Sequence, residues 1–226
     1  MIAMMLSGGI LVYNEAPIIR RALESLWRTC DEVIAFDGFS TDGTRSILDA
    51  YGCKVCEHEF DNHRNQKNRV MEKCSHDWVL LLDADEYLNN KLADSIQALA
   101  QEAESKGHDA VGFPRLNLLD GIPTGAWPDV QTRLLRNHVR FGGHPFHAPP
   151  LAANAMILAG QDRLIIHDKT RERQERQNRL YYYMRPGDYS SKPPGAEDVS
   201  PPKENFEDRQ DLNTYAEYLQ KFSQSS

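Results

Sequence analysis

Residues 78–86 read WVLLLDADE, and this stretch decides the fold class. Its first five residues are apolar throughout, which is typical of a strand that is covered on both faces and therefore of a parallel sheet. Further strand and helix patterns alternate before it: strands at 10–12, 33–36 and 55–60, and helices at 18–27, 47–51 and 64–74. This alternation over the first 105 residues predicts an α/β fold with a mostly parallel, Rossmann-like sheet and helices on both faces.

The second half of the chain has a different texture. Short apolar runs at 110–113, 132–135 and 164–166 are separated by Gly, Pro and Asn, which predicts mixed strands joined by long loops. We therefore expect one domain over 1–170, divided into halves at 1–105 and 106–170. Beyond it, we expect a basic helix at 171–185 and a polar, Pro-rich linker with a short C-terminal helix at 186–226.

Composition and charge exclude several classes of protein. The chain has 226 residues, 40% of them hydrophobic, and a net charge of -7, from 26 Lys and Arg against 33 Asp and Glu. These values describe an ordinary globular protein and exclude collagen, coiled coil and wholesale disorder. The acidic balance does not favour a nucleic-acid partner, and no apolar stretch is long enough for a membrane span.

The four cysteines are too few for a disulfide scaffold of this length, and we expect reduced thiols in a cytoplasmic protein. Cys53 and Cys56 form a C-x-x-C pair, which leaves a redox or zinc role open beside that of buried small side chains.

Polar residues follow the predicted strands at the sheet edge where open parallel sheets bind ligands. They are Asn14 and Glu15 after the first strand, Asp37 after the second, and Asp83 and Asp85 after the fourth. The spacing of Asp83 and Asp85 puts both carboxylates on one side of an extended chain. Such a pair suits Mg²⁺ or Mn²⁺ shared with phosphate oxygens. The alternative is a strand-ending Asp that caps the next helix.

A divalent cation is required if a diphosphate is to bind beside these carboxylates. A carboxylate about 5 Å from a phosphate charge costs roughly 3 kcal/mol at an effective dielectric of about 20. Several such repulsions would expel a diphosphate, and a divalent ion reverses their sign.

Four segments in this order closely resemble family 2 glycosyltransferases with the type A nucleotide-sugar fold. They are VYNEAPIIRRALESL at 12–26, DEVIAFDGFSTDGTR at 31–45, QKNRVMEKCSHDWVLLLDADEYL at 66–88 and WPDVQTRLLR at 127–136. More narrowly, they are similar to the bacterial lipopolysaccharide-core glucosyltransferase subgroup, and the resemblance covers about residues 3–167. It implies metal-dependent, inverting transfer of a hexose from a nucleotide sugar, with UDP expected, to an acceptor hydroxyl. In these terms, 1–105 is the nucleotide-binding half of the catalytic domain and 106–170 the acceptor half.

The resemblance also implies roles for the donor-side residues. Asn14 and Glu15 would lie near the nucleotide, and Asp37 would contact the uracil or ribose. Lys67 would bind the diphosphate, although a solvated helix face is its alternative. Asp83 would bind the donor and, with Asp85, hold Mn²⁺ or Mg²⁺. A C-terminal histidine often completes such a metal site, and His167 matches it, although a lone histidine after a strand is more often structural.

The acceptor-side match is less complete. The resemblance places Asp129, Gln131 and Arg133 on the acceptor or donor-sugar side, and Trp127 either stacks on a sugar or packs in the core. The subgroup usually has His-Glu near the acceptor, where this chain has His147 followed by Ala148. The general base is therefore open, with Asp129 as first choice and His147 as second.

Two other functions compete with glycosyl transfer. The missing acidic residue at Ala148 leaves a sugar-nucleotide-binding protein without activity as one alternative. A D-x-D phosphatase is the weaker one, because Tyr87 follows the motif. The motifs do not identify the acceptor, which could be a saccharide, a lipid-linked sugar, a protein or a modified nucleobase. The basic strip within 171–185 reads as a solvated helix face or as a contact for an anionic acceptor or membrane surface.

Overall fold

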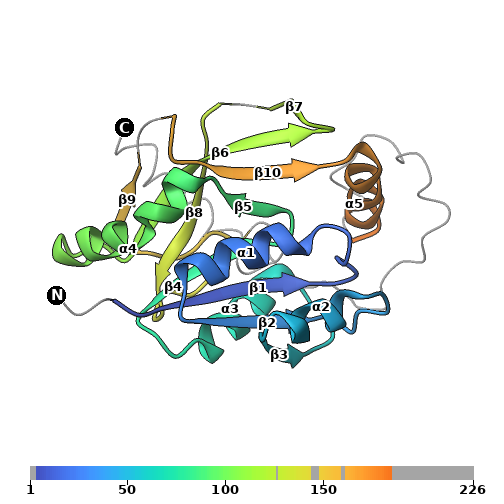
Figure 1. Ribbon diagram of the computed structural model, residues 1–226, viewed down its shortest axis with the longest axis horizontal. Coiled ribbons are helices and arrows are strands. Elements are labelled where there is room, and N and C mark those ends of the chain that lie inside the picture. Colours follow the sequence, from blue (N-terminus) through green and yellow to red (C-terminus); the bar gives the residue numbers. More distant parts are fainter. Residues whose placement is uncertain (1–3, 126, 144–147, 159–160, 185–226) are drawn as a thin grey trace.

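A ten-stranded mixed sheet organises the part of the chain that the computed structural model describes, residues 4–125, 127–143, 148–158 and 161–184 (Figure 1). Its strands are β1 (Leu6–Val12), β2 (Glu32–Asp37), β3 (Lys54–Glu57), β4 (Trp78–Asp83), β5 (Glu86–Leu88), β6 (Ala110–Leu119), β7 (Ile122–Pro123), β8 (Asp129–Arg136), β9 (Ala155–Ile157) and β10 (Ile165–Lys169). The helices are α1 (Ile19–Thr29), α2 (Thr44–Ala50), α3 (His63–Lys73), α4 (Asn90–Ser105) and α5 (Arg171–Met184).

The first half of the chain forms the parallel part of the sheet. The main path runs β3-β2-β1-β4-β8-β6-β10-β5, and β1 pairs in parallel with both β2 and β4, as β2 does with β3. The carboxyl ends of these four strands therefore meet at one edge, towards which the arrows of β1 and β2 point in Figure 1. The predicted order of strands and helices up to β4 is confirmed.

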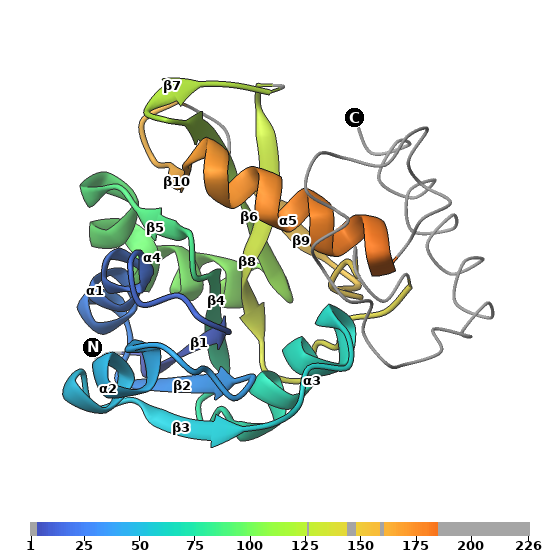
Figure 2. The ribbon, with the colours of Figure 1, turned by 90° about the vertical axis from the view of Figure 1, so that its right-hand side faces the viewer.

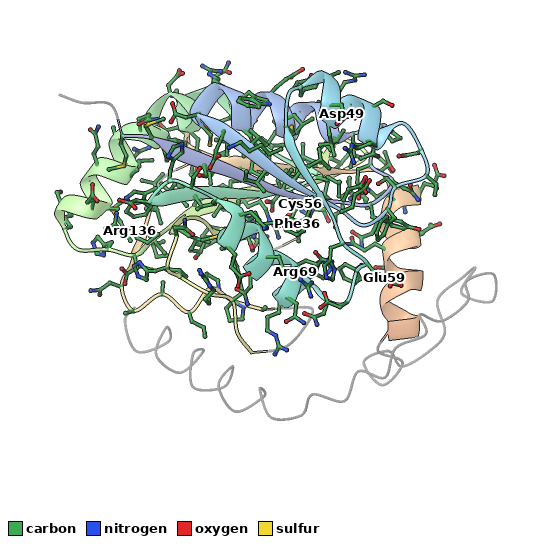
Figure 3. The ribbon with its side chains drawn as sticks, turned by 90° about the horizontal axis from the view of Figure 1, so that it is seen from below. Phe36, Asp49, Cys56, Glu59, Arg69 and Arg136 are labelled. Carbon is green, nitrogen blue, oxygen red and sulfur yellow. The ribbon has the colours of Figure 1, made fainter. Side chains whose placement is uncertain are left out.

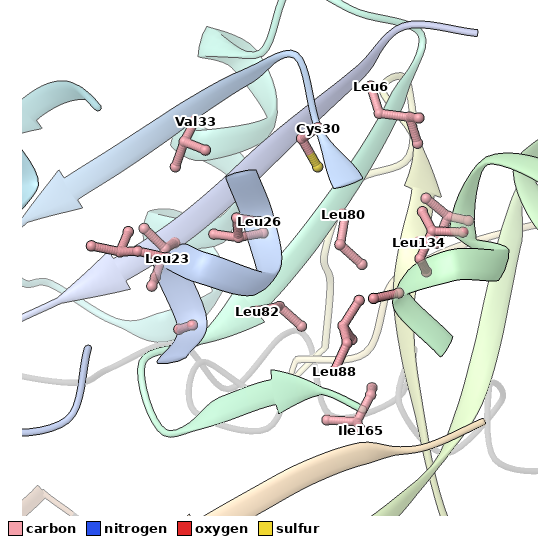
Figure 4. Close-up of a cluster of buried hydrophobic side chains, with 14 of the residues drawn as sticks. Leu6, Leu23, Leu26, Cys30, Val33, Leu80, Leu82, Leu88, Leu134 and Ile165 are labelled. Atoms are coloured by element: carbon pink, nitrogen blue, oxygen red, sulfur yellow. The ribbon is translucent and has the colours of Figure 1, made fainter. Parts of the chain in front are cut away.

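The all-apolar strand β4 is buried because helices cover both faces of the sheet. Leu80 and Leu82 pack in one core cluster with Leu23 and Leu26 of α1, and α2 and α4 contribute to the same cluster (Figure 4). The alternate side chains of β4 enter a second cluster beneath α3. Two cores thus share one strand, which explains why its sequence shows no polar alternation.

The second half adds strands of mixed direction, as the sequence predicts. β8 is antiparallel to both β4 and β6, β10 is parallel to β6, and β5 is antiparallel to β10. The short strands β7 and β9 also pair with β6. β6 continues to Leu119, well past the apolar run at 110–113, because its later residues pair with β10. These residues are only partly buried and tolerate polar side chains.

The cysteines are free thiols, and their surroundings are apolar. Burial raises the pKa of Cys30 and of Cys74 to about 12, and that of Cys53 to about 11. Cys56 lies opposite Phe36 in the register of β2 and β3, at the margin of the second core cluster (Figure 3). Cys53 packs against the first core cluster and Cys56, in β3, against the second.

Helix α5 lies across the sheet edge where the parallel strands end (Figure 2). It corresponds to the helix expected at 171–185. The expected linker and final helix at 186–226 lie outside the described residues. Within the described ranges, no helix is long and apolar enough to cross a membrane.

Candidate functional site

The loops after β1 and β2 are tied together by side-chain hydrogen bonds. Ser40 Oγ accepts the N–H of Asn14 at 2.9 Å and donates to Asp37 Oδ1 at 2.6 Å. The N–H of Glu15 donates to Thr44 Oγ1 at 2.8 Å. Asn14 has a φ of 56°, a conformation that Asn tolerates better than most residues. The turn at 40–44 thus fixes Asn14, Glu15 and Asp37 at the carboxyl edge, and Asp37 Oδ2 receives no hydrogen bond from the described residues.

Asp83 and Asp85 have different partners. Asp83, at the end of β4, accepts a hydrogen bond from Arg133. Asp85 lies in the turn after β4, where its Oδ2 is 3.3 Å from His167 Nε2. Among the described residues, no group of three or more His, Cys, Asp or Glu side chains is arranged to hold a metal ion. The structure therefore brings Asp85 and His167 together and leaves Asp83 with an arginine.

A buried ion-pair network links β5, β6 and β8 next to this edge. Glu86 is 0% exposed and accepts hydrogen bonds from Arg133 Nε and from Arg115 Nη1, both at 2.7 Å. Arg133 is only 5% exposed, and its hydrogen bond to Asp83 connects the buried network to the end of β4. Burial raises the pKa of Asp83, but the charges of Arg133 and Lys67 outweigh it, and the net pKa lies well below the usual range.

Asp129 is held by four hydrogen bonds. Its Oδ2 accepts from Arg115 Nε and Nη2 and from Asn117 Nδ2, and its Oδ1 accepts from Gln131 Nε2 at 2.7 Å. Burial works to raise the pKa of Asp129, but the hydrogen bond from Asn117 and the contacts with Arg115 lower it overall. Asp129 and Gln131 are thus hydrogen-bonded to each other, and Asp129 also accepts hydrogen bonds from two side chains of β6.

The same hydrogen bonds fix the tautomer of His167. Because Asn117 donates its Nδ2 to Asp129, its Oδ1 is the atom that faces His167 Nδ1, at 2.7 Å. His167 Nδ1 must then carry a proton and donate it to Asn117. In the neutral imidazole, the lone pair of Nε2 consequently faces the carboxylate of Asp85.

This pair of atoms fits a divalent cation. Two ligands about 2.1–2.2 Å from one octahedral ion lie about 3 Å apart, close to the 3.3 Å between Asp85 Oδ2 and His167 Nε2. Asn117 behind His167 supplies the acceptor that metal-binding histidines usually have at their other nitrogen. Burial works to raise the pKa of Asp85, but its contact with His167 and neighbouring positive charges lower it to about 2, so the carboxylate is ionised at neutral pH.

The remaining predicted residues take different positions. Lys67 Nζ lies 5.3 Å from the centre of the Phe141 ring and makes no ion pair with a described residue. Burial lowers the pKa of Lys67, while the charge of Asp83 works to raise it. Trp127 is 43% exposed, so it is not a core residue. His147 lies outside the described residues, and Ala148 is buried.

The family is shown by comparison with known proteins. Residues 8–158 match the model of the family described as glycosyl transferase family 2. The chain belongs to this family. Its fold also resembles that of TarS from S. aureus, with a TM-score of 0.56 and 18% identity over 80% of this chain and 40% of TarS.

Relatives of this family 2 chain carry glycosyltransferase names. An uncharacterized glycosyltransferase of Rickettsia felis is 39% identical over 92 residues, which are 41% of this chain and 32% of the relative. The lipopolysaccharide core biosynthesis glycosyltransferase LpsC of Rhizobium meliloti is 31% identical over 137 residues, 58% of this chain and 50% of LpsC. The similarity to a lipopolysaccharide-core enzyme is thereby confirmed. The chain spans about a third of the length of the Rickettsia relative and half that of LpsC.

Sequence reasoning missed four basic and amide residues of the site: Arg115, Asn117, Lys169 and Arg173. Arg115 and Asn117 are alternate residues of β6 and therefore lie on the same face of the sheet. The sequence does not reveal this pattern, because only the apolar run at 110–113 indicates a strand there. Arg173 belongs to the basic strip, for which the sequence offered a solvated face or a contact for an anionic acceptor or membrane surface. The structure instead turns Arg173 towards Asp85, whereas the side chain of Arg171 is 72% exposed.

Proposed function

We propose that this chain transfers a hexose from a UDP-sugar to an acceptor hydroxyl, with inversion at the anomeric carbon and with Mn²⁺ or Mg²⁺ as cofactor. Family membership supports glycosyl transfer. The observation that carries the metal is the 3.3 Å separation of His167 Nε2 and Asp85 Oδ2, with His167 Nδ1 directed at Asn117. At this distance the two atoms suit a shared cation, with Asn117 as the partner of the second ring nitrogen.

The donor would lie along the carboxyl edge. The free Oδ2 of Asp37 would accept from the uracil or ribose, with Asn14 and Glu15 beside the nucleotide. TarS, which has a similar fold, was crystallised with UDP-GlcNAc, and this supports a uridine nucleotide here. Lys67, whose ammonium has no ion pair with a described residue, suits the diphosphate as a point charge.

The reaction would be one in-line displacement. The acceptor oxygen forms a bond to the anomeric carbon, the bond from that carbon to the diphosphate oxygen breaks, and UDP leaves with the bonding electrons. Asp85 and His167 would hold the metal ion, with Asp83 beside them as the donor ligand predicted from the sequence. When bound, the ion stabilises the charge that develops on the leaving diphosphate.

The hydroxyl proton must pass to a base, and Asp129 and His147 stay the predicted candidates. A base works best when its pKa lies near the working pH. The four hydrogen bonds to Asp129 lower its pKa, so a base role for it requires Arg115 or Asn117 to release the carboxylate when the acceptor binds. On the acceptor side, Gln131 and the half-exposed Trp127 are proposed to contact sugar.

The first test measures release of nucleoside diphosphate from a panel of nucleotide sugars by mass spectrometry, with Mn²⁺ and without it. We expect UDP release that depends on the metal and falls by about 10²-fold or more in D85N, since charge stabilisation of the leaving group is lost. The matched control is D94N, because Asp94 pairs with Arg28 on the exposed face of α4.

The outcomes separate the three functions. Metal-dependent UDP release that D85N abolishes and D94N retains supports the proposal. Binding of a nucleotide sugar without turnover in the parent chain would replace it with the non-catalytic alternative. Release of inorganic phosphate would replace it with the phosphatase.

A further inference from the structure

Helix α5 brings a guanidinium to the proposed metal ligand. Arg173, in the first turn of α5, donates from Nη1 and Nη2 to the two carboxylate oxygens of Glu15, the second contact measuring 2.9 Å. Its Nε lies 3.3 Å from Asp85 Oδ2, the same oxygen that faces His167. The Arg173 side chain is 16% exposed, so this contact is shielded from bulk water.

A second cation approaches the same oxygen. Lys169 Nζ lies 3.9 Å from Asp85 Oδ2, and its side chain is 12% exposed. Lys169 is also held by Gln177 of α5, whose Oε1 accepts from Nζ at 2.6 Å. The end of β10 and the start of α5 thus supply Asp85 with two positive charges from this chain.

Positive charges of this chain offset most of the negative charge of the site. Among the described residues, the carboxylates are Glu15, Asp37, Asp83, Asp85, Glu86 and Asp129, and the cations are Lys67, Arg115, Arg133, Lys169 and Arg173. Adding a divalent cation alone would leave an excess of about one positive charge in a partly buried site, which low local polarity penalises. A diphosphate that enters with the cation removes this excess.

We propose that Arg173 is an internal counter-cation that competes with the divalent metal for Asp85 and must leave this carboxylate before the metal binds. This inference rests on the proposed metal site at Asp85. Arg173 donates two hydrogen bonds to Glu15 but makes a single contact with Asp85. Arg173 can therefore withdraw from Asp85 while Glu15 still holds it.

The proposal has a consequence for binding order. The metal alone must displace Arg173 and approach Lys169, so it binds weakly. With UDP present, the phosphates offset the displaced positive charge, and the metal binds more tightly. By thermodynamic linkage, UDP and the metal then strengthen each other's binding by the same factor.

The experiment titrates the full chain with MnCl₂, with and without UDP, and measures free Mn²⁺ by electron paramagnetic resonance. Without UDP, we expect R173Q to bind Mn²⁺ about tenfold more tightly than the wild type, because one positive charge beside the ligand is gone. UDP should then raise the Mn²⁺ affinity of R173Q by a smaller factor than that of the wild type. R173K keeps the charge and should stay close to the wild type.

Two matched variants control the comparison. R171Q removes the same charge from the same helix, at a side chain that faces solvent near Asp120, and should leave Mn²⁺ affinity unchanged. K169Q removes the more distant cation and should strengthen Mn²⁺ binding by a smaller factor than R173Q. K169Q also keeps the test decisive if R173Q does not fold, as judged by circular dichroism.

Equal or weaker Mn²⁺ binding by R173Q, or by K169Q where R173Q is unfolded, would overturn the competition. D85N distinguishes this result from failure of the proposed function. If D85N abolishes Mn²⁺ binding but R173Q does not strengthen it, the metal site stands and the competition fails. If Mn²⁺ binds equally well to D85N, the metal site itself fails, and the inference fails with it.

Discussion

Arg133 joins β8 to the D-x-D turn, and R133M tests what this link contributes to stability. Arg133 donates from Nε and Nη2 to the two oxygens of Glu86, at 2.7 and 2.8 Å, and from Nη2 to Asp83. Methionine keeps an unbranched apolar chain of similar reach and removes the guanidinium. We expect R133M to fold and to lose stability through the carboxylates that it leaves behind.

The structure sets the size of the loss. Breaking a buried ion pair by removing one partner costs about 3–5 kcal/mol. Here Glu86 Oε1 keeps Arg115 at 2.7 Å, whereas Oε2 keeps, among the described residues, only the N–H of Asp83 at 3.2 Å. The side chain of Asp83 is 39% exposed, so water replaces Arg133 there. One carboxylate oxygen is thus left poorly satisfied, and we expect the lower end, about 3 kcal/mol at pH 7.

Urea denaturation followed by circular dichroism measures the free energy of unfolding. The matched control is R136M on the same strand, because Arg136 pairs with Glu104 at a partly exposed position and should cost about 1 kcal/mol or less. In a double-mutant cycle, E86Q and R133M together should cost about 2 kcal/mol less than the sum of the two single changes. A loss below about 1 kcal/mol for R133M, or full additivity in the cycle, would refute the network as described.

Two predictions concern stability away from the site. Burial works to raise the pKa of Glu32, but hydrogen bonds led by that of Lys54 lower it from 4.5 to about 2. E32Q should therefore lower the free energy of unfolding by about 2 kcal/mol at pH 7. In urea denaturation, the gap in unfolding free energy between E32Q and the wild type should shrink as pH falls from 4.5 towards 2. A gap that is unchanged at about pH 2.5, near the lower end of that window, would contradict this linkage. A Cβ added at Gly9 would lie 2.5 Å from Val70 Cγ1 and 2.9 Å from Leu81 Cδ1; G9A should lower the free energy of unfolding by about 1–3 kcal/mol, and V70A should recover part of this loss, whereas a neutral G9A would contradict the close approach of α3.

The sequence predicts the parallel half of the fold well because burial there has a simple pattern. The apolar run of β4 and the helix pattern of α1 each reflect one physical cause, coverage on both faces or on one. The pairing of β5 with β10 has no such local signal: Glu86–Leu88 is three residues long and follows directly on the D-x-D turn. Its place is decided by residues about 80 positions away in the sequence, such as Ile165.

The site was predictable in its acidic members and only partly in its basic ones, since the sequence indicated Lys67 and Arg133 but not Arg115, Lys169 or Arg173. Asp37 and Asp83 end strands and Asp85 follows one, and a strand end is visible in the sequence. Arg115 lies inside β6, and Arg173 lies inside α5, where a basic residue looks the same whether it faces solvent or a carboxylate. Which way such a side chain points depends on how the elements pack, and only the structure supplies that.

The division of charge between the two halves of the chain bears on how the site is built. Within residues 1–105, Glu15, Asp37, Asp83, Asp85 and Glu86 bring five carboxylates to one sheet edge, and of the site cations among the described residues only Lys67 belongs to that half. The others come from 106–184, on β6, β8, β10 and α5. The strands after residue 105 therefore do more than extend the sheet. They neutralise the acidic edge, and because the ion pairs cross between the halves, any ligand that brings its own positive charge must compete with them.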